Sequence, residues 1–385
     1  DLCYGRPAGL REWARAHLPF WGIGLVYALF VHHHLAAAFA EPPPRSVAVN
    51  LLSQANVIAR YLRLLLVPVG LNVFHVLPEV GSVATFPTPY SLTLLFLLLA
   101  LAVVAWRRHR VVTFAVLWFF ITLSPTSSVL PLKILMSEHR LYLPGVGFSV
   151  LLAAFICGPL WRRLHRGAFV LALLMLALYG AGTISRNAVW KDEVTLWADA
   201  ERKSPGRVEP HIQMGLGYVE RGMLDAAIAE YNRALRIYPY LPEVHYNLGN
   251  VYLRKGDCAR AVEEYHTMLE LVPSSAQAHY ALGLAHGAQL DFARALEHFA
   301  WAMRLDPRHA DAARKIELMH ALERLHARAR EELARDPEGA KGNFLLGNVY
   351  ANAGRFREAA ECYDRSLQAD PSQYSVQLVL GKIYL

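Results

Sequence analysis

Residues 242–275 read PEVHYNLGNVYLRKGDCARAVEEYHTMLELVPSS, and features of this stretch recur on both sides of it. Gly249 lies midway in the sequence between Gly215 and Gly283. The same interval links Ala227, Ala261 and Ala295; Tyr231, Tyr265 and Phe299; and Pro239, Pro273 and Pro307. The prolines close the units, because proline cannot continue a helix. This period predicts a stack of helix–turn–helix units.

The period, about 34 residues, and its residue types are those of the tetratricopeptide repeat (TPR). We expect an α-solenoid over residues 207–385, with repeats at 208–241, 242–275, 276–309 and 340–373 and a partial repeat at 374–385. Residues 310–339 break the period, since the proline due at position 341 comes at Pro337. We therefore predict a shortened, degenerate helix pair at 310–339.

The first helices of stacked TPR units line a concave surface that holds a peptide or a partner helix. The candidate groove residues are Tyr246, Asn247, Asn250, Tyr280, Phe344 and Asn348. Asparagine suits this role because its amide can bond both the N–H and the C=O of an extended peptide. The array thus predicts a protein or peptide partner, and a solvated face without a specific ligand is the alternative.

A half-repeat at residues 186–206 precedes the array. Trp197, Ala200 and Pro205 lie one full period before Tyr231, Ala234 and Pro239. The spacing predicts a lone second helix that caps the array and couples it to the segment before it.

The part of the chain before position 186 is much more apolar than the rest. Five segments lack Lys, Arg, Asp and Glu altogether: 18–40, 90–106, 111–130, 141–161 and 167–185. A helix crosses the hydrocarbon core with about 20 apolar residues. Residues 1–185 are therefore predicted to be a polytopic transmembrane helix bundle of about five spans, which makes the whole chain all-α. Residues 46–67, which contain Arg60 and Arg63, are predicted to form an interfacial or re-entrant helix.

Basic clusters between the apolar segments predict the orientation, since Lys and Arg favour the cytoplasmic side. Residues 107–110 and 162–166 are such clusters, and Arg6, Arg11 and Arg15 precede the first span. With all three inside, residues 41–89, 131–140 and everything after Ser185 lie outside. We expect an integral membrane protein, with the TPRs periplasmic in a bacterial inner membrane or lumenal in the endoplasmic reticulum of a eukaryote.

Two polar motifs lie on this predicted outer side. Glu138, His139 and Arg140 are adjacent at the mouth of the fourth span, where charged groups are costly unless they are used. Arg140 could bind a lipid phosphate with two parallel hydrogen bonds, and His139 could support this contact or handle a proton. Arg60 and Arg63 are three residues apart and share a helix face. The alternative is that both motifs are solvated interfacial anchors.

Other chemistries are not supported. The net charge of +7 sits in short clusters around apolar segments, and no motif favours nucleic acid. His32, His33 and His34 point about 100° apart in a helix, so they suit a polar lining better than a metal. No metal site and no cofactor are evident from the motifs.

Four stretches resemble the transmembrane and TPR-containing O-mannosyltransferase family and its bacterial relatives, which are GT-C class glycosyltransferases. They are residues 60–72 (RYLRLLLVPVGLN), residues 138–144 (EHRLYLP), residues 185–187 with 190–197 (SRN and WKDEVTLW), and the repeats.

The resemblance implies a polyprenyl-phosphate-linked sugar donor and a protein acceptor held by the TPRs. It supports lipid-phosphate contact at Arg60, Arg63, His139 and Arg140. The catalytic acid of the family lies in a first outer loop that has no counterpart in this chain, and Glu138 does not take that role. Where relatives are expected to have an acidic residue soon after the Asn72 position, this chain has Val73, Phe74 and His75.

Two functions remain open. The chain is either the C-terminal part of a glycosyltransferase that O-glycosylates proteins, or a membrane-anchored TPR scaffold without catalysis. A factor for assembling envelope polysaccharide is a third interpretation. Because the chain begins at Asp1 and ends inside a repeat, we expect it to be a piece of a longer protein.

Overall fold

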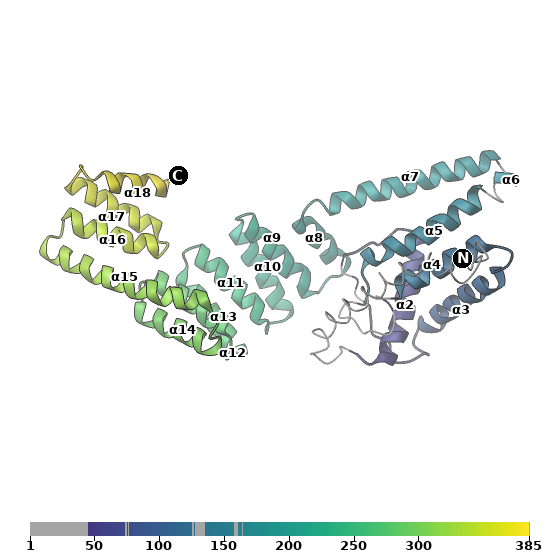
Figure 1. The fold of residues 1–385 in the computed structure, drawn as a ribbon, viewed down its shortest axis with the longest axis horizontal. Helices are drawn as coiled ribbons and strands as arrows, with labels where there is room; N and C mark the ends of the chain where they lie inside the picture. The colour runs from purple at the N-terminus through teal and green to yellow at the C-terminus, as the bar shows by residue number, and fades with distance from the viewer. Residues whose placement is uncertain are drawn as a thin grey trace, which may run out of the picture. The chain divides into compact units, whose positions relative to one another are not determined.

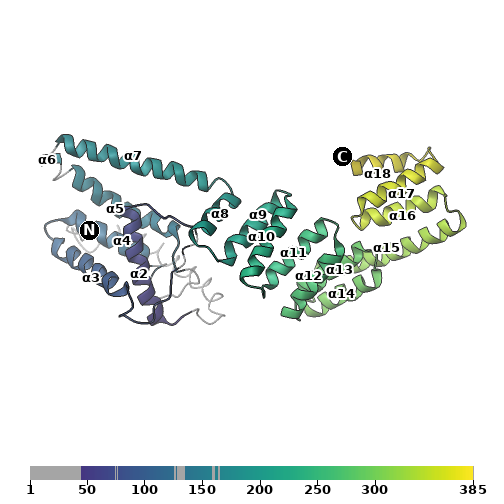
Figure 2. The same cartoon turned by 180° about the vertical axis from the view of Figure 1, so that it is seen from behind.

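The computed structural model describes residues 45–384, apart from residues 74, 76, 125–126, 128–134, 158–160 and 164. Within these residues every regular element is a helix. The chain divides into two compact units, Asp1–Pro205 and Gly206–Leu385. Figures 1 and 2 show the helices of each unit from opposite sides. The predicted first span, residues 18–40, and the three adjacent histidines lie outside the described residues.

The first unit is a set of apolar helices joined by short turns and longer irregular segments. Its elements are α2 (Val47–Leu66), α3 (Thr88–Ala105), α4 (Arg110–Leu123), η1 (Glu138–Leu141), α5 (Tyr142–Phe155), α6 (Trp161–Arg163), α7 (His165–Val189) and α8 (Glu193–Lys203).

Helix α2 provides the core of the first unit. Val57, Tyr61 and Leu64 are buried on one of its faces and pack with side chains of α4 and of residues 135–136. Polar side chains of α2 are buried as well, and Ser53 accepts a hydrogen bond from the backbone N–H of Val80 at 2.9 Å. The helix at 46–67 is thus the packed centre of its unit. Its placement at a membrane interface stays a prediction.

Two helices in the described part of the chain are long and apolar enough to cross a membrane, α3 and α7. They correspond to the predicted spans at 90–106 and 167–185. The predicted spans at 111–130 and 141–161 contain the shorter apolar helices α4 and α5. The five-span bundle is therefore confirmed only as a group of apolar helices.

The second unit consists of helix pairs. Its helices are α9 (Val208–Glu220), α10 (Leu224–Ile237), α11 (Pro242–Arg254), α12 (Cys258–Leu271), α13 (Ala276–Ala288), α14 (Phe292–Leu305), α15 (Ala310–Arg335), α16 (Ala340–Asn352), α17 (Phe356–Ala369) and α18 (Tyr374–Tyr384). The boundaries of the pairs agree with the predicted repeats except at α15.

A glycine against an aromatic ring holds each of four pairs together. A Cβ added to Gly283 would lie 2.6 Å from Cε1 of Phe299, and one added to Gly347 would lie 2.6 Å from Cε1 of Tyr363. Gly215 and Gly249 meet Tyr231 and Tyr265 in the same way. Because no side chain fits into such a gap, only glycine allows this helix crossing. Each of these rings thus lies against the glycine of its own helix pair.

The predicted degenerate helix pair at 310–339 is wrong, since residues 310–335 form the single helix α15. Residues 310–335 contain neither glycine nor proline, and they are rich in Ala, Leu, Glu and Arg, which favour helix. Without a turn residue the chain continues one helix through the position where the repeat period would place a turn.

The connecting half-repeat predicted at 186–206 does contain one helix, α8. The side chain of Asp192 caps it by accepting a hydrogen bond from the N–H of Thr195 at 2.9 Å. The chain up to Pro205 belongs to the first unit. Its contacts there form part of the candidate site.

Candidate functional site

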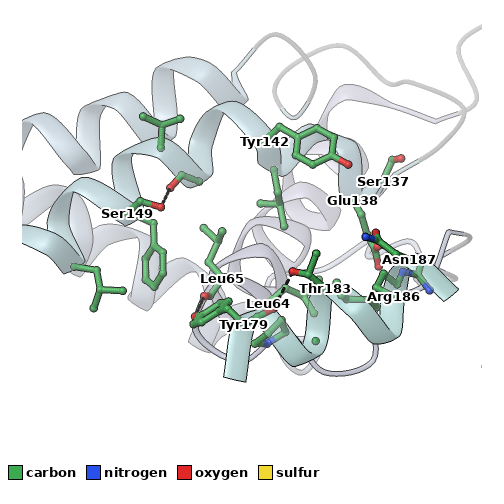
Figure 3. A pocket seen from close by; sticks show the side chains of 18 of the residues that line it. Leu64, Leu65, Ser137, Glu138, Tyr142, Ser149, Tyr179, Thr183, Arg186 and Asn187 are labelled. Carbon is green, nitrogen blue, oxygen red and sulfur yellow. Dashed lines mark hydrogen bonds and ion pairs between the residues drawn. The ribbon is translucent and has the colours of Figure 1, made fainter. Parts of the chain in front are cut away.

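A cavity of about 1050 Å³ lies in the first unit between α5 and α7. Its lining comes from the end of α2 and the segment after it, from η1 and α5, and from α7 with the residue that follows it. Most of these side chains are apolar, among them Leu64, Leu65, Val146, Phe148 and Leu152. Figure 3 shows the charged side chains Glu138 and Arg186 at one end, together with Ser137 and Asn187, whereas hydroxyl groups such as those of Ser149 and Thr183 lie elsewhere along the lining.

Tyr61 of α2 fixes the turn that carries Glu138. Its hydroxyl donates to the carbonyl of Ser137 at 2.9 Å and accepts from the N–H of the same residue at 2.9 Å. Tyr61 is fully buried, so this pair of hydrogen bonds to the backbone of Ser137 is shielded from water. The helix that carries Arg60 and Arg63 is therefore held next to residues 138–140, which are far from it in the sequence, and Tyr61 makes the contact.

Glu138 is the centre of a polar network. Its Oε1 is 3.0 Å from Nε2 of His75 and also accepts from the backbone N–H of Asn72. Its Oε2 accepts from Nη2 of Arg186 at 3.3 Å. The side chain of His75 is only 3% exposed and that of Glu138 is 17% exposed. Both carboxylate oxygens are thus used to hold the loop after α2 and the end of α7.

Arg186 links this network to α8. Its Nη1 donates to Oδ2 of Asp199 at 2.9 Å, and its guanidinium lies 5.7 Å from the ring of Trp190. Its Nε is buried and has no hydrogen-bond partner among the described residues. A buried N–H that is left unpaired costs free energy, so this donor suits an anionic ligand at the polar end of the cavity.

Asp199 anchors α8 under this arrangement. Burial alone would raise its pKa, but hydrogen bonds from Lys203 and Arg202, together with the charge of Arg186, hold the pKa of this carboxyl below its usual range. Lys203 also donates to the carbonyl of Leu71, and Ser204 accepts from Nδ2 of Asn72 at 3.0 Å. The end of α8 is therefore bound to the loop that carries His75.

Helix α7 contacts α2 at a second point. The hydroxyl of Tyr179 donates to the carbonyl of Leu65 at 2.7 Å, where the end of α2 leaves carbonyls without helical partners. Between Tyr179 and Arg186, Gly182 lines the cavity, and a Cβ added there would meet no atom within 4 Å. The small residue leaves the cavity open along α7.

Arg60, Arg63 and Arg140, three of the four residues that we predicted for lipid phosphate, do not line this cavity. Arg60 is half-buried with an unpartnered Nε, and Arg63 is exposed. Arg140 donates to the carbonyl of Leu135 at 3.3 Å, and the side chain of His139 lies outside the described residues. The arginine that lines the cavity is Arg186. It belongs to the SRN stretch at residues 185–187, for which no role was predicted. Phosphate contact at the other four stays a prediction.

The six predicted groove residues of the second unit lie half-buried on first helices. Asn250 and Asn348 accept hydrogen bonds from the hydroxyls of Tyr265 and Tyr363, each at 2.8 Å. Tyr246, Tyr280 and Phe344 pack beside the aromatic ring of their own pair. These residues therefore support the repeat, and the asparagine nitrogens are the groups left to donate to a ligand.

Family models match the second unit in three places. Residues 215–256 match a model described as TPR repeat, and residues 246–289 and 340–373 match models described as tetratricopeptide repeat. These segments are TPRs. The predicted TPRs are therefore confirmed over these residues, including the repeat that follows α15.

Three relatives that are protein O-mannosyl-transferases match the chain at 23–25% identity. Protein O-mannosyl-transferase F38B6.6 of Caenorhabditis elegans is 25% identical over 182 residues, which cover 46% of this chain and 26% of that protein. Protein O-mannosyl-transferase TMTC1 of Homo sapiens is 24% identical and covers 51% of this chain and 24% of that protein. Protein O-mannosyl-transferase Tmtc3 of Drosophila melanogaster is 23% identical, and the match covers 60% of this chain and 28% of that protein. The chain thus spans about a quarter of the length of these relatives.

The match to the Drosophila relative extends beyond the TPRs. Residues 206–385 make up less than half of the chain, whereas the match covers 60% of it. Part of the first unit is therefore included in the similarity.

Solved structures that are similar to part of the chain include TPR proteins. A thermophilic TPR protein from Thermus thermophilus is 24% identical with a TM-score of 0.30, covering 46% of this chain and 99% of that one. YrrB, described as a TPR protein with an unusual peptide-binding site, is 20% identical with a TM-score of 0.30. The match covers 48% of this chain and 97% of that one.

Proposed function

We propose that this chain is the C-terminal part of a membrane-embedded GT-C glycosyltransferase that O-glycosylates protein acceptors. The cavity between α5 and α7 holds a polyprenyl-phosphate-linked sugar donor, with the isoprenoid chain along the apolar walls and the phosphate at Arg186. The TPRs hold the acceptor outside the cytoplasm. The chain supplies donor and acceptor sites, and the catalytic acid comes from sequence before it.

The observation that carries this proposal is the polarity of the cavity. One end has a guanidinium with a buried, unpartnered Nε, and the rest is lined mostly by apolar side chains from α2, α5 and α7, with no other charged side chain apart from Glu138 among the described residues. A phosphate on a long hydrocarbon chain has the same two-part chemistry, since guanidinium binds phosphate with charge-assisted hydrogen bonds. The similarity to O-mannosyl-transferases, which reaches into the first unit, supports it further.

Glu138 has a positioning role in this proposal. With His75 and the N–H of Asn72 on one oxygen and Arg186 on the other, it holds the guanidinium at the mouth of the cavity. Arg60, Arg63, His139 and Arg140 remain candidates for contacts with neighbouring lipid headgroups.

A binding measurement with purified protein in detergent tests the proposal. The probes are polyprenyl monophosphate and the matching polyprenol without phosphate. Arg186→Gln is expected to weaken binding of the monophosphate by about tenfold to a hundredfold, because a hydrogen bond to a charged group contributes roughly 1.5–3 kcal/mol. Binding of the polyprenol stays unchanged. Arg162→Ala, at an exposed arginine away from the cavity, leaves both probes unaffected.

A second pair of variants tests the hydrocarbon part. Gly182→Leu places a side chain in the cavity and is expected to weaken both probes. Gly180→Leu is the matched control, since it lies on the same helix, also has open space at its Cβ and does not line the cavity. Equal binding by Gly182→Leu and Gly180→Leu, or unchanged monophosphate binding by Arg186→Gln, would contradict the proposal.

A membrane-anchored scaffold without catalysis would also use the TPR unit, which the family models identify. Repeats of this kind commonly bind other proteins. The scaffold differs in requiring no donor. A scaffold would bind neither probe in a way that depends on Arg186 or Gly182, so the same experiment separates the two.

A further inference from the structure

A second cavity, of about 1110 Å³, lies within the TPR unit. The turn between α11 and α12 and the turn between α16 and α17 both line it, although more than two repeat lengths separate them in the sequence. Its floor comes from the end of α13 and from α15. We call it the turn pocket. None of the six predicted groove residues lines it.

The single helix α15 is one reason why the two turns line one cavity. Residues Lys315, Leu318 and Met319 of α15 line the pocket between them. Burial raises the pKa of the Cys258 thiol, and the charge of Arg355 across this space acts in the opposite direction. The pocket is therefore a feature of this chain's interrupted array.

The charges around the turn pocket are mostly positive. Its lining includes Arg254, Lys255, Lys315, Arg355 and Arg357, against the carboxylates of Asp257 and Glu358. Both carboxylates already have partners. Oδ2 of Asp257 accepts from Nε of Arg260 at 2.5 Å, and Oε1 of Glu358 accepts from Nε of Arg355 at 2.8 Å.

Lys315 is a half-buried cation of the pocket that is available to a ligand. It lies on α15, and in the described part of the chain it makes no hydrogen bond or ion pair within the usual distances. Its charge acts on Asp311 one turn earlier, but that carboxylate is already bonded to Arg314. A partly buried ammonium without an anion of its own is costly, which a carboxylate from a ligand would relieve.

Apolar groups complete the pocket. Leu284, Leu318 and Met319 lie on its floor, and Phe356 at its rim has 57% of its surface exposed. An exposed aromatic side chain next to an apolar floor favours a large apolar side chain in the ligand.

From these observations we propose that the turn pocket binds an acidic peptide segment of a partner protein, with one large apolar side chain on the floor and carboxylates at Lys315 and the flanking arginines. This inference is independent of the proposed sugar transfer, because it concerns only residues of the TPR unit.

Fluorescence anisotropy with the full chain in detergent tests it. The probe is a labelled synthetic peptide with glutamates on both sides of a central phenylalanine, and its counterparts carry lysines in place of the glutamates or glycine in place of the phenylalanine. The acidic peptide is expected to bind with an affinity that falls as salt rises, since exposed charges are screened. Both counterparts bind more weakly by about tenfold or more.

Variants locate the site. Lys315→Glu and Phe356→Ala are each expected to weaken binding of the acidic peptide by about tenfold. The controls are Lys341→Glu and Tyr374→Ala, an exposed lysine and an exposed aromatic that do not line the pocket. Binding that is unchanged by Lys315→Glu and Phe356→Ala overturns the proposal. So does binding that is lost instead with Asn247→Ala and Asn250→Ala, which would place the peptide in the concave groove.

Discussion

At the scale of single residues, the surroundings of His298 in the TPR unit disfavour its charged form. Its ring is stacked on that of His286 with centroids 5.4 Å apart, and its Nδ1 is 3.1 Å from Nδ1 of His279. Burial lowers its pKa to about 4, and the charges of His286, His279, His266 and Arg294 act in the same direction. The fold thus keeps His298 neutral.

We expect the TPR unit to lose stability as pH falls from about 6.5 towards 4. In this range the unfolded chain binds a proton at His298 that the folded chain does not, so ionisation favours unfolding. The effect is roughly 2 kcal/mol between pH 7 and pH 4, after allowing for the partial exposure of the ring. Chemical denaturation followed by circular dichroism at several pH values measures it.

His298→Gln should flatten this pH dependence, because the glutamine cannot titrate. His320→Gln is the control, since the side chain of His320 is 51% exposed. If the free energy of unfolding is the same at pH 7 and pH 4.5, or if both variants behave like the parent protein, the assignment to His298 is wrong.

Single residues also show how far the sequence could predict the structure. The regular spacing of Gly283 and its counterparts was enough to identify the repeats, because each glycine is required by a ring in its own pair. Asn250 and Asn348 precede their tyrosine partners by the same interval in both repeats, a pattern that could have indicated the hydrogen bond. Arg186 had no such signal. Its position depends on Glu138, which is distant in the sequence, and local spacing does not reveal a contact of that kind.

At the scale of elements, α15 shows where a period misleads. The repeat phase predicted a turn within 310–339, but local helix preference decided the outcome because residues 310–335 contain no glycine or proline. Turn residues were present in three of the other pairs, where Gly222, Gly256 and Gly354 adopt positive φ angles between their two helices. Local composition and the period together would have predicted α15 better than the period alone.

Glu323→Pro tests whether α15 is continuous. Glu323 lies in the interior of the helix and is exposed, so its side chain contributes little to packing. Proline in a helix interior costs about 3 kcal/mol, which corresponds to a fall in melting temperature of roughly 6–12 °C for a unit of this size. Thermal unfolding by circular dichroism measures it, with Glu323→Ala as the control. A turn at this position would tolerate proline, and an unchanged melting temperature would show that the helix pair exists after all.

At the scale of the whole molecule, the two units differ in the solvent that their surfaces suit. Helix α7 exposes Leu176 at 71% and Ile184 at 75%, and α3 exposes Val103 and Val104 to a similar degree. The helices of the TPR unit instead bury an apolar stripe between neighbours and expose charged groups. A long helix with apolar side chains on all sides is stable in lipid and costly in water.

We therefore predict that α7 crosses the membrane, so that the TPRs lie on the side opposite the cytoplasm. Topology reporters fused after Arg110, after Arg166 and after Pro205 test this, because the first two follow basic clusters that favour the cytoplasmic side. The first two fusions should report the cytoplasm, and the third should report the opposite side. The fusions after Arg166 and Pro205 differ by only one candidate span, α7. If both report the same side, α7 does not cross, and a donor cavity beside it would no longer face the lipid from which a polyprenyl chain could enter.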